Sequence, residues 1–198
     1  MPYSLISSLN RMARVGVLAV ALGAAVASAT AAADGAAAPP TFVQQALPAA
    51  ALLGQGQMRF LGLRIYDARL WVGPQFKAAD FGDYPLALEL SYHRAFKGAA
   101  IAQRSIDEIE RQGELTPAQA QRWLKVLTAL LPDVQSGDRL TGLYQPGQGM
   151  RFWRGEQPLG ATDDAELARR FFAIWLSPRT SEPVLRSALL ARRSESGP

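Results

Sequence analysis

The stretch "GQGQMRFLGLRIYDARLWVGP", residues 54–74, has the composition of a β-strand and decides the fold class of the chain. It is rich in aromatic, β-branched and aliphatic residues, which strands favour. Four polar side chains nevertheless stand close together in its centre, Arg64, Tyr66, Asp67 and Arg69. A strand that helps to build a core carries such a group only where both of its faces are partly exposed to solvent or where one face lines a polar cleft. We therefore expect one long strand here, at the surface or beside a binding site.

The order of patterns along the rest of the chain predicts an α+β fold. In residues 84–96, leucines alternate with other residues at the period of a strand. Helical spacing, the capping residues Thr116 and Thr162, the stop signal Gly113 and a turn at "QPGQG" predict helices within 97–114, 115–134, 162–176 and 177–193 and a hairpin within 138–155. We expect a mainly antiparallel sheet with a helical layer on one face. Six aromatic residues should lie mostly in the core, namely Trp123, Phe152, Trp153, Phe171, Phe172 and Trp175.

The two ends of the chain differ in composition from this domain, which we place at residues 51–192. Residues 1–33 carry Arg11 and Arg14, then a short apolar run and small residues, which is the layout of a secretory signal peptide. The alternative is a membrane anchor, but the run is shorter than the roughly 20 apolar residues of a span. We expect cleavage, export to the periplasm, a disordered mature N-terminus over residues 34–50 and a frayed tail over residues 193–198.

Composition leaves little room for several kinds of site. The 198-residue chain has no cysteine and a single histidine, His93, so we expect no metal site, no Ser-His-Asp triad and a structural role for His93. Asp133 and Asp138 suit turn and cap chemistry better than calcium binding. Two of the 21 basic residues precede residue 34, so the chain has 19 basic and 17 acidic residues after cleavage. The basic residues form no polybasic block. Such a chain does not indicate nucleic-acid binding.

Four stretches together resemble the chalcone isomerase superfamily, and most of all its exported bacterial members. They are "RIYDARLWV" (64–72), "LALELSY" (86–92), "LLPDVQSGDRL" (130–140) and "FFAIWLSP" (171–178), within a resemblance that runs from about Gly54 to Leu190. The resemblance implies an open-faced β-sandwich with a ligand cleft between a large antiparallel sheet and its helices. The superfamily contains isomerases that close a chalcone into a flavanone, fatty-acid-binding members and members with no known ligand.

The isomerases share a Tyr-x-x-Lys-x-x-x-Asn pattern on the helix after the long strand. Its positions correspond here to Ile101, Arg104 and Glu108, so the tyrosine is missing and an arginine keeps the positive charge. Tyr66 stands where the enzymes place a threonine, and Ala173 stands where they place a late hydroxyl residue. The resemblance therefore implies that the chain does not cyclise chalcones, and we assign no catalytic residue.

The fatty-acid-binding members pair an arginine near the start of the first strand with a tyrosine at the threonine position, and together these hold a carboxylate. Tyr66 matches that tyrosine, and two arginines compete for the second role. Arg64 shares the strand parity of Tyr66, whereas Arg59 joins it only if a bulge or glycines shift the register. A solvated strand face is the alternative. Arg104 with Glu108 is either an exposed helix pair or part of the site.

The candidate ligand-binding residues are therefore Arg59, Arg64, Tyr66 and Arg104. We expect a periplasmic binding protein for a small amphipathic molecule such as a fatty acid or a phenolic acid. It would need no cofactor, bind no nucleic acid and have no stable membrane insertion after cleavage. Two alternatives remain: an isomerase (intramolecular lyase) acting on a chalcone-like enone, with arginine and tyrosine stabilising an oxyanion, and a structural or partner-binding protein with a vestigial cleft. Protein partners and oligomeric state stay open.

Overall fold

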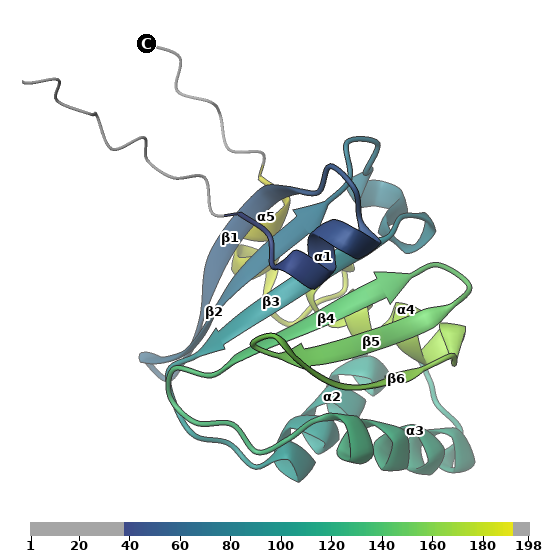
Figure 1. The fold of residues 1–198 in the computed structure, drawn as a ribbon. Helices are drawn as coiled ribbons and strands as arrows, with labels where there is room; N and C mark the ends of the chain where they lie inside the picture. The colour runs from purple at the N-terminus through teal and green to yellow at the C-terminus, as the bar shows by residue number, and fades with distance from the viewer. Residues whose placement is uncertain (1–37, 192–198) are drawn as a thin grey trace, which may run out of the picture. The chain divides into compact units, whose positions relative to one another are not determined.

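The structure, a computed structural model, describes residues 38–191, which form one antiparallel sheet with helices on both faces (Figure 1). The six strands lie side by side in chain order. They are β1 (Ala51–Phe60), β2 (Leu63–Val72), β3 (Leu86–Tyr92), β4 (Arg139–Gln145), β5 (Gly149–Arg154) and β6 (Gln157–Thr162). The helices are α1 (Thr41–Ala46), the 3-10 helix η1 (Ala78–Asp83), α2 (Gly98–Gln112), α3 (Pro117–Leu130), α4 (Ala165–Leu176) and α5 (Pro183–Leu190). The predicted α+β class, with a large antiparallel sheet and a helical layer, is confirmed.

The stretch that was expected to form one strand is a hairpin of two. Phe60 pairs with Leu63, and the two residues between them, Leu61 and Gly62, have φ angles of 48° and 80°. Two positive φ angles in a two-residue loop are what a type I′ turn requires, and its usual sequences are Asn-Gly or Asp-Gly. Leu-Gly carries that signal only in its second residue, so the prediction of one long strand was wrong.

The main core lies between the sheet and the layer formed by α2, α3, α4 and α5. Leu86, Leu88 and Leu90 of β3 all point into it, as their period-2 spacing predicted. Trp123 of α3 and Phe172 of α4 are fully buried in the same core. Each of these helices buries one face in this core, against the apolar side chains that the sheet presents on the same side.

The opposite face of the sheet is covered in part by α1, in a range that was expected to be disordered. Val43 and Leu47 are buried against Trp71 of β2, and the Phe42 ring stacks on Trp153 of β5 with centroids 4.4 Å apart. For the part of residues 34–50 that the structure describes, the expectation of disorder is therefore wrong. Apolar side chains at the spacing of one helical turn are enough to dock the segment.

One predicted helix cap is confirmed, a second is wrong, and one strand was not predicted. Thr116 caps α3 as expected, since its hydroxyl oxygen accepts a hydrogen bond from the Gln119 amide. The cap of α4 is Asp164 rather than Thr162, because the Asp164 carboxylate accepts from the Leu167 amide. Strand β6 had no counterpart in the sequence analysis, since its Pro and Gly residues are atypical of strands.

Helix α5 packs closely on β1. A Cβ atom at Gly54 would lie 2.4 Å from the Ala188 carbonyl oxygen, so only glycine allows this approach. Among the residues described, no helix is long and apolar enough to span a bilayer. The expected signal peptide (1–33) and frayed tail (193–198) lie outside the described residues.

Candidate functional site

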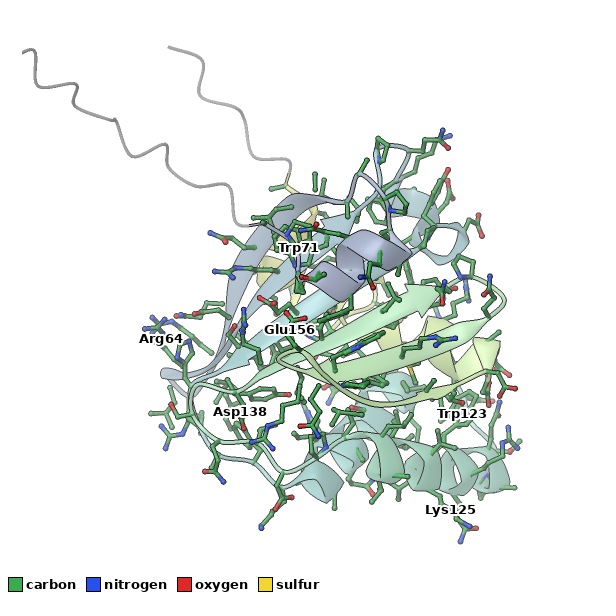
Figure 2. The ribbon with its side chains drawn as sticks, in the orientation of Figure 1. Arg64, Trp71, Trp123, Lys125, Asp138 and Glu156 are labelled. Atoms are coloured by element: carbon green, nitrogen blue, oxygen red, sulfur yellow. The ribbon has the colours of Figure 1, made fainter. Side chains whose placement is uncertain are left out.

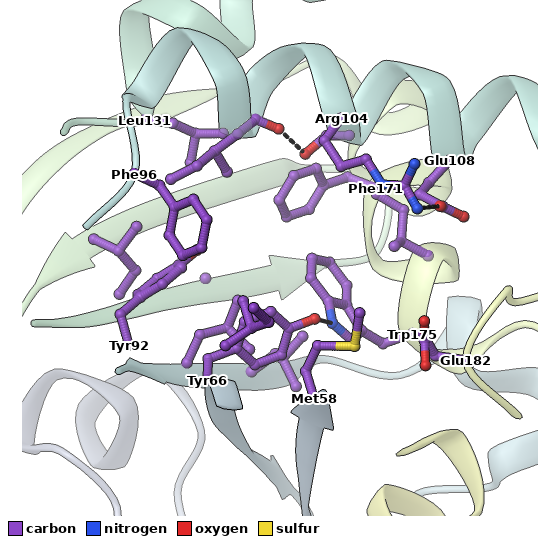
Figure 3. A pocket seen from close by; sticks show the side chains of 18 of the residues that line it. Met58, Tyr66, Tyr92, Phe96, Arg104, Glu108, Leu131, Phe171, Trp175 and Glu182 are labelled. Carbon is purple, nitrogen blue, oxygen red and sulfur yellow. Dashed lines mark hydrogen bonds and ion pairs between the residues drawn. The ribbon is translucent and has the colours of Figure 1, made fainter. Parts of the chain in front are cut away.

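A cavity of about 420 Å³ lies between the sheet, α2, α4 and the segment that precedes α5 (Figure 3). This volume is within the range of roughly 300–1,000 Å³ that small-molecule sites occupy. Most of its wall is apolar, and its main apolar residues are Met58, Phe60, Ile65, Leu88, Leu90, Phe96, Ile101, Leu131, Leu140, Phe152, Phe171, Phe172 and Ile174. Polar groups come from a few side chains, namely Tyr66, Tyr92, Arg104, Ser105, Glu108, Trp175, Ser181 and Glu182.

A bulge in β2 determines which of its residues reach this cavity. Met58 pairs with Tyr66 and Arg59 pairs with Arg64, so Ile65 is left over between them. One extra residue in a strand reverses the alternation of faces beyond it. Ile65 and Tyr66 therefore both line the cavity, and Arg64 turns to the other face of the sheet.

Arg59 and Arg64 consequently belong to a polar network outside the cavity. Arg59 Nε donates to Gln57 Oε1 at 2.7 Å, and Gln57 in turn donates to Asp67. Arg64 lies 3.4 Å from Asp67 Oδ2, and His93 lies 2.8 Å from the same oxygen. Hydrogen bonds from Gln57 and His93 lower the pKa of Asp67, although desolvation alone would raise it.

This network overturns the expected placement of the arginines. The prediction that Arg64 shares a face with Tyr66 is wrong, because the bulge at Ile65 intervenes. Arg59 does not join Tyr66 either, since its guanidinium bonds along the outer face. The clamp of Tyr66 with either residue is therefore not formed, and the alternative of a partly solvated strand face applies to both arginines.

Tyr66 is the central polar group of the cavity wall. Trp175 Nε1 donates a hydrogen bond to its hydroxyl oxygen at 3.0 Å, which fixes the phenol against α4. Burial raises the pKa of Tyr66 well above its ordinary value, so the hydroxyl keeps its proton at neutral pH. Among the described residues no group accepts a hydrogen bond from this hydroxyl, so its proton is available to a ligand.

Helix α2 supplies the charged part of the wall. Ile101, Arg104 and Glu108 lie three and four residues apart, and all three line the cavity. Arg104 lies 2.6 Å from Glu108 Oε1, and Arg111 lies 3.6 Å from Glu108 Oε2. The Glu108 side chain is 6% exposed and that of Arg104 is 59% exposed, so the arginine reaches from solvent over a buried carboxylate.

A second carboxylate, Glu182, faces the same region from the segment before α5 (Figure 3). Desolvation raises its pKa, and the negative charge of Glu108 raises it further. The charged wall therefore holds one guanidinium and two carboxylates. Such a wall accepts hydrogen-bond donors readily and accepts an anion only through Arg104 and the Tyr66 hydroxyl.

Sequence reasoning found some of these residues and missed others. Tyr66 and Arg104 were candidates and do line the cavity. Trp175 was assigned to the core, because a tryptophan at helical spacing gives no sign that its N–H reaches a distant strand. Glu182 was not singled out at all, and a glutamate before a proline in a loop carries no such signal. His93, Asp133 and Asp138 serve structural contacts.

Comparisons with known proteins agree with this architecture. A model of the family described as chalcone isomerase-like matches residues 75–191, a range that includes α2 and Trp175 but begins after Tyr66. A crystal structure of a fatty-acid binding protein from Arabidopsis thaliana superposes with a TM-score of 0.56 at 14% identity, covering 72% of this chain and 87% of the other. At that identity the likeness shows the fold alone. No curated protein matches the sequence.

Proposed function

We propose that this chain, which belongs to the chalcone isomerase-like family, binds a small amphipathic molecule in the cavity between its sheet and helices and does not transform it. The apolar body of the ligand lies against the leucine and phenylalanine side chains, and its head group meets Tyr66 and Arg104. The observation that carries this proposal is a largely apolar cavity whose wall presents the Tyr66 hydroxyl proton, for which no described residue is an acceptor, and the guanidinium of Arg104.

The ligand class that fits best is a fatty acid or a phenolic acid. The apolar wall suits an acyl chain or an aromatic ring, because burying either gains roughly 25 cal/mol per Å² of apolar area. The similar structure from Arabidopsis thaliana is a fatty-acid binding protein, which supports the same class. Arg104 has five N–H donors, so it can bind a ligand carboxylate while it keeps its contact with Glu108.

The two carboxylates limit how tightly an acid is held. Glu108 already occupies part of the guanidinium of Arg104, and Glu182 adds a second negative charge nearby. We therefore expect moderate affinity for acids and a gain in affinity when Glu182 becomes neutral.

The non-catalytic part of the proposal follows from what α2 carries. The positions that resemble the catalytic pattern of the isomerases do face the cavity, but the first of them is Ile101 and offers no phenol. The runner-up function is isomerisation of a chalcone-like enone. Its specific support is that Tyr66 and Arg104 both line the cavity and could stabilise an enolate oxygen. A turnover assay separates the two functions.

The place of action that we propose is the periplasm, reached through cleavage of residues 1–33. This part of the proposal rests on sequence alone. Intact-mass measurement of the protein from a periplasmic extract tests it, and a mature chain that begins between residues 28 and 36 is the expected result. A full-length chain that retains Met1 in a membrane fraction would contradict it.

Binding itself is tested in two ways. Native mass spectrometry of protein purified from the periplasm should reveal a co-purifying small molecule, and titration of long-chain fatty acids should show saturable binding at one site. The control is a variant with the cavity filled, Gly142→Leu, because a Cβ at Gly142 already lies 3.0 Å from Phe172 and a larger side chain projects among the cavity residues. No saturable binding of any acid, alcohol or phenol to the wild type would overturn the proposed function.

A further inference from the structure

The tip of the β1–β2 hairpin exposes a cluster of large apolar side chains. Phe60 is 57% exposed, Leu61 is 86% exposed and Leu63 is 48% exposed, and together they surround the turn. Only one other large hydrophobic residue in the described part of the chain, Val184, is comparably exposed. Single exposed hydrophobic residues are ordinary, whereas a contiguous exposed apolar patch is typical of an interaction surface. The hairpin end projects at the edge of the sheet away from α3 (Figure 1).

The turn holds its leucine at a local conformational cost. Leu61 has a φ of 48°, a region that bulky side chains rarely adopt and that Asn or Gly would enter without strain. Neither folding nor solubility benefits from an 86% exposed leucine at this position. Strain of this kind is commonly kept for a function rather than for the fold.

Two arginines flank the apolar tip. Arg59 and Arg64 are directly opposite each other in the register of β1 and β2. Like charges at facing positions of a sheet destabilise it, and Asp67 compensates only Arg64 directly, at 3.4 Å. Figure 2 shows Arg64 at the hairpin end, with its side chain directed outward. A partner that carries negative charge in a layer around an apolar interior would satisfy both the arginines and the leucines.

The tip is continuous with the ligand cavity. Phe60 is exposed at the tip and also lines the cavity, together with Met58 and Ile65 of the same hairpin. A surface that covers the tip therefore also meets the rim of the cavity. An apolar ligand could pass between the two without crossing water.

We propose that the hairpin tip docks on the surface of a lipid bilayer that contains anionic lipids. Phe60, Leu61 and Leu63 enter the interface between headgroups and acyl chains, and Arg59 and Arg64 contact the lipid phosphates. Apolar side chains with flanking cations are the combination that holds peripheral proteins at anionic membranes. The chain rests on the surface through this tip alone, and the cavity opens toward the lipid. The docking does not depend on the proposed function, whereas the transfer of ligand does.

The test is co-sedimentation of the full mature chain with vesicles of phosphatidylethanolamine and phosphatidylglycerol. We expect the wild type to sediment with these vesicles and to bind vesicles of phosphatidylcholine alone much more weakly. The variant Leu61→Asn should reduce partitioning of the protein into the vesicles by about tenfold, because it removes one leucine side chain that the bilayer would bury. Asparagine also suits a positive φ, so this variant should fold at least as well as the wild type.

The charge contribution is measured with a matched pair. Arg64→Gln should lower binding to the anionic vesicles by a few-fold and reduce its salt dependence. Lys125→Gln removes the same charge from α3, far from the hairpin (Figure 2), and should have no effect beyond a small change in net charge. Equal losses for both variants would overturn the docking geometry, because they would indicate attraction by net charge only.

Ligand titration without vesicles keeps the two proposals apart. Leu61→Asn and Arg64→Gln should bind fatty acid in solution as the wild type does, since neither residue lines the cavity. Loss of vesicle binding with intact ligand binding supports the docking surface. Wild type that binds ligand but no vesicles of any composition would refute docking and leave the function standing. A change of Leu61→Asn from dimer to monomer, without vesicle binding by the wild type, would assign the tip to a second copy of the chain instead.

Discussion

The indole of Trp175 donates a 3.0 Å hydrogen bond to the hydroxyl oxygen of Tyr66, and this bond joins α4 to β2 in the wall of the cavity. Because the tyrosine oxygen accepts from the indole, its own proton is left for a ligand. The bond also holds the phenol at a fixed angle, so little rotational freedom is lost when a ligand binds. Figure 3 shows the two side chains in contact below the charged residues of α2.

Tyr66→Phe should weaken the binding of a fatty acid without closing the cavity. The change removes one hydrogen bond, which contributes roughly 0.5–1.5 kcal/mol, or up to about 3 kcal/mol when the acceptor is charged. Isothermal titration with wild type and variant measures the loss. Tyr144→Phe is the control, because the Tyr144 hydroxyl donates to the Gly82 carbonyl outside the cavity and its loss should change stability alone. Equal affinities of Tyr66→Phe and wild type would contradict the role of the hydroxyl.

Arg104→Gln should reduce affinity for acids more than for the matching alcohols. A hydrogen bond between charged groups contributes about 1.5–3 kcal/mol, which corresponds to roughly ten- to a hundredfold in affinity. Arg111→Gln is the matched control, since Arg111 also approaches Glu108 but does not line the cavity. If both variants lose affinity equally, the loss comes from removing an ion-pair partner of Glu108 rather than from removing a contact with the ligand.

Acid binding should strengthen as pH falls through the raised pKa of Glu182. Desolvation and the charge of Glu108 raise this pKa, so the side chain becomes neutral above the pH at which an exposed glutamate would. Protonation removes a negative charge from the cavity wall, and an anionic ligand is then repelled less. A medium-chain alkanesulfonate is a suitable probe because its head group stays ionised throughout. The affinity of Glu182→Gln should be higher at neutral pH and nearly independent of pH, and a wild type without pH dependence would refute the assignment.

The purified protein should not accelerate chalcone ring closure appreciably. Ile101 stands where the isomerases share a tyrosine, so the phenol is missing there. Ala173 stands where they place a hydroxyl residue. An absorbance assay that follows loss of the chalcone is the measurement. Turnover on the order of 1 per second or faster would reverse this expectation and would assign the missing role to Tyr66, which Tyr66→Phe would then abolish.

Gly54→Ala should destabilise the fold through α5. The new Cβ would lie 2.4 Å from the Ala188 carbonyl oxygen, and backbone atoms cannot give way as a flexible side chain can. Overpacking of this kind costs roughly 1–3 kcal/mol. Gly73→Ala is the control, because nothing lies within 4 Å of a Cβ at that position. Urea unfolding of both variants should show a lower midpoint for Gly54→Ala only.

The fold class followed from the sequence because it depends on local patterns. The alternating leucines of β3, the Thr116 cap of α3 and the glycine that ends α2 each act over a few neighbouring residues. The errors arose where a local signal was weak. Leu61 entered a turn that normally requires asparagine or aspartate, and β6 formed from residues that pair only because β5 lies beside them.

The candidate site was predictable only in part. The sequence singled out Tyr66 and Arg104 as candidates, because the family resemblance gives each a place in a motif, and both residues line the cavity. The tertiary structure decided which other groups stand beside them. One unpaired residue, Ile65, turned Arg64 to the outer face, and α4 brought Trp175 to Tyr66 although 109 positions separate them in the chain. Beyond a bulge, side chains point to the opposite face of the sheet from the one that simple alternation predicts. Packing between elements that are distant in the chain leaves no trace in local residue spacing. These two effects decide which polar groups line this cavity.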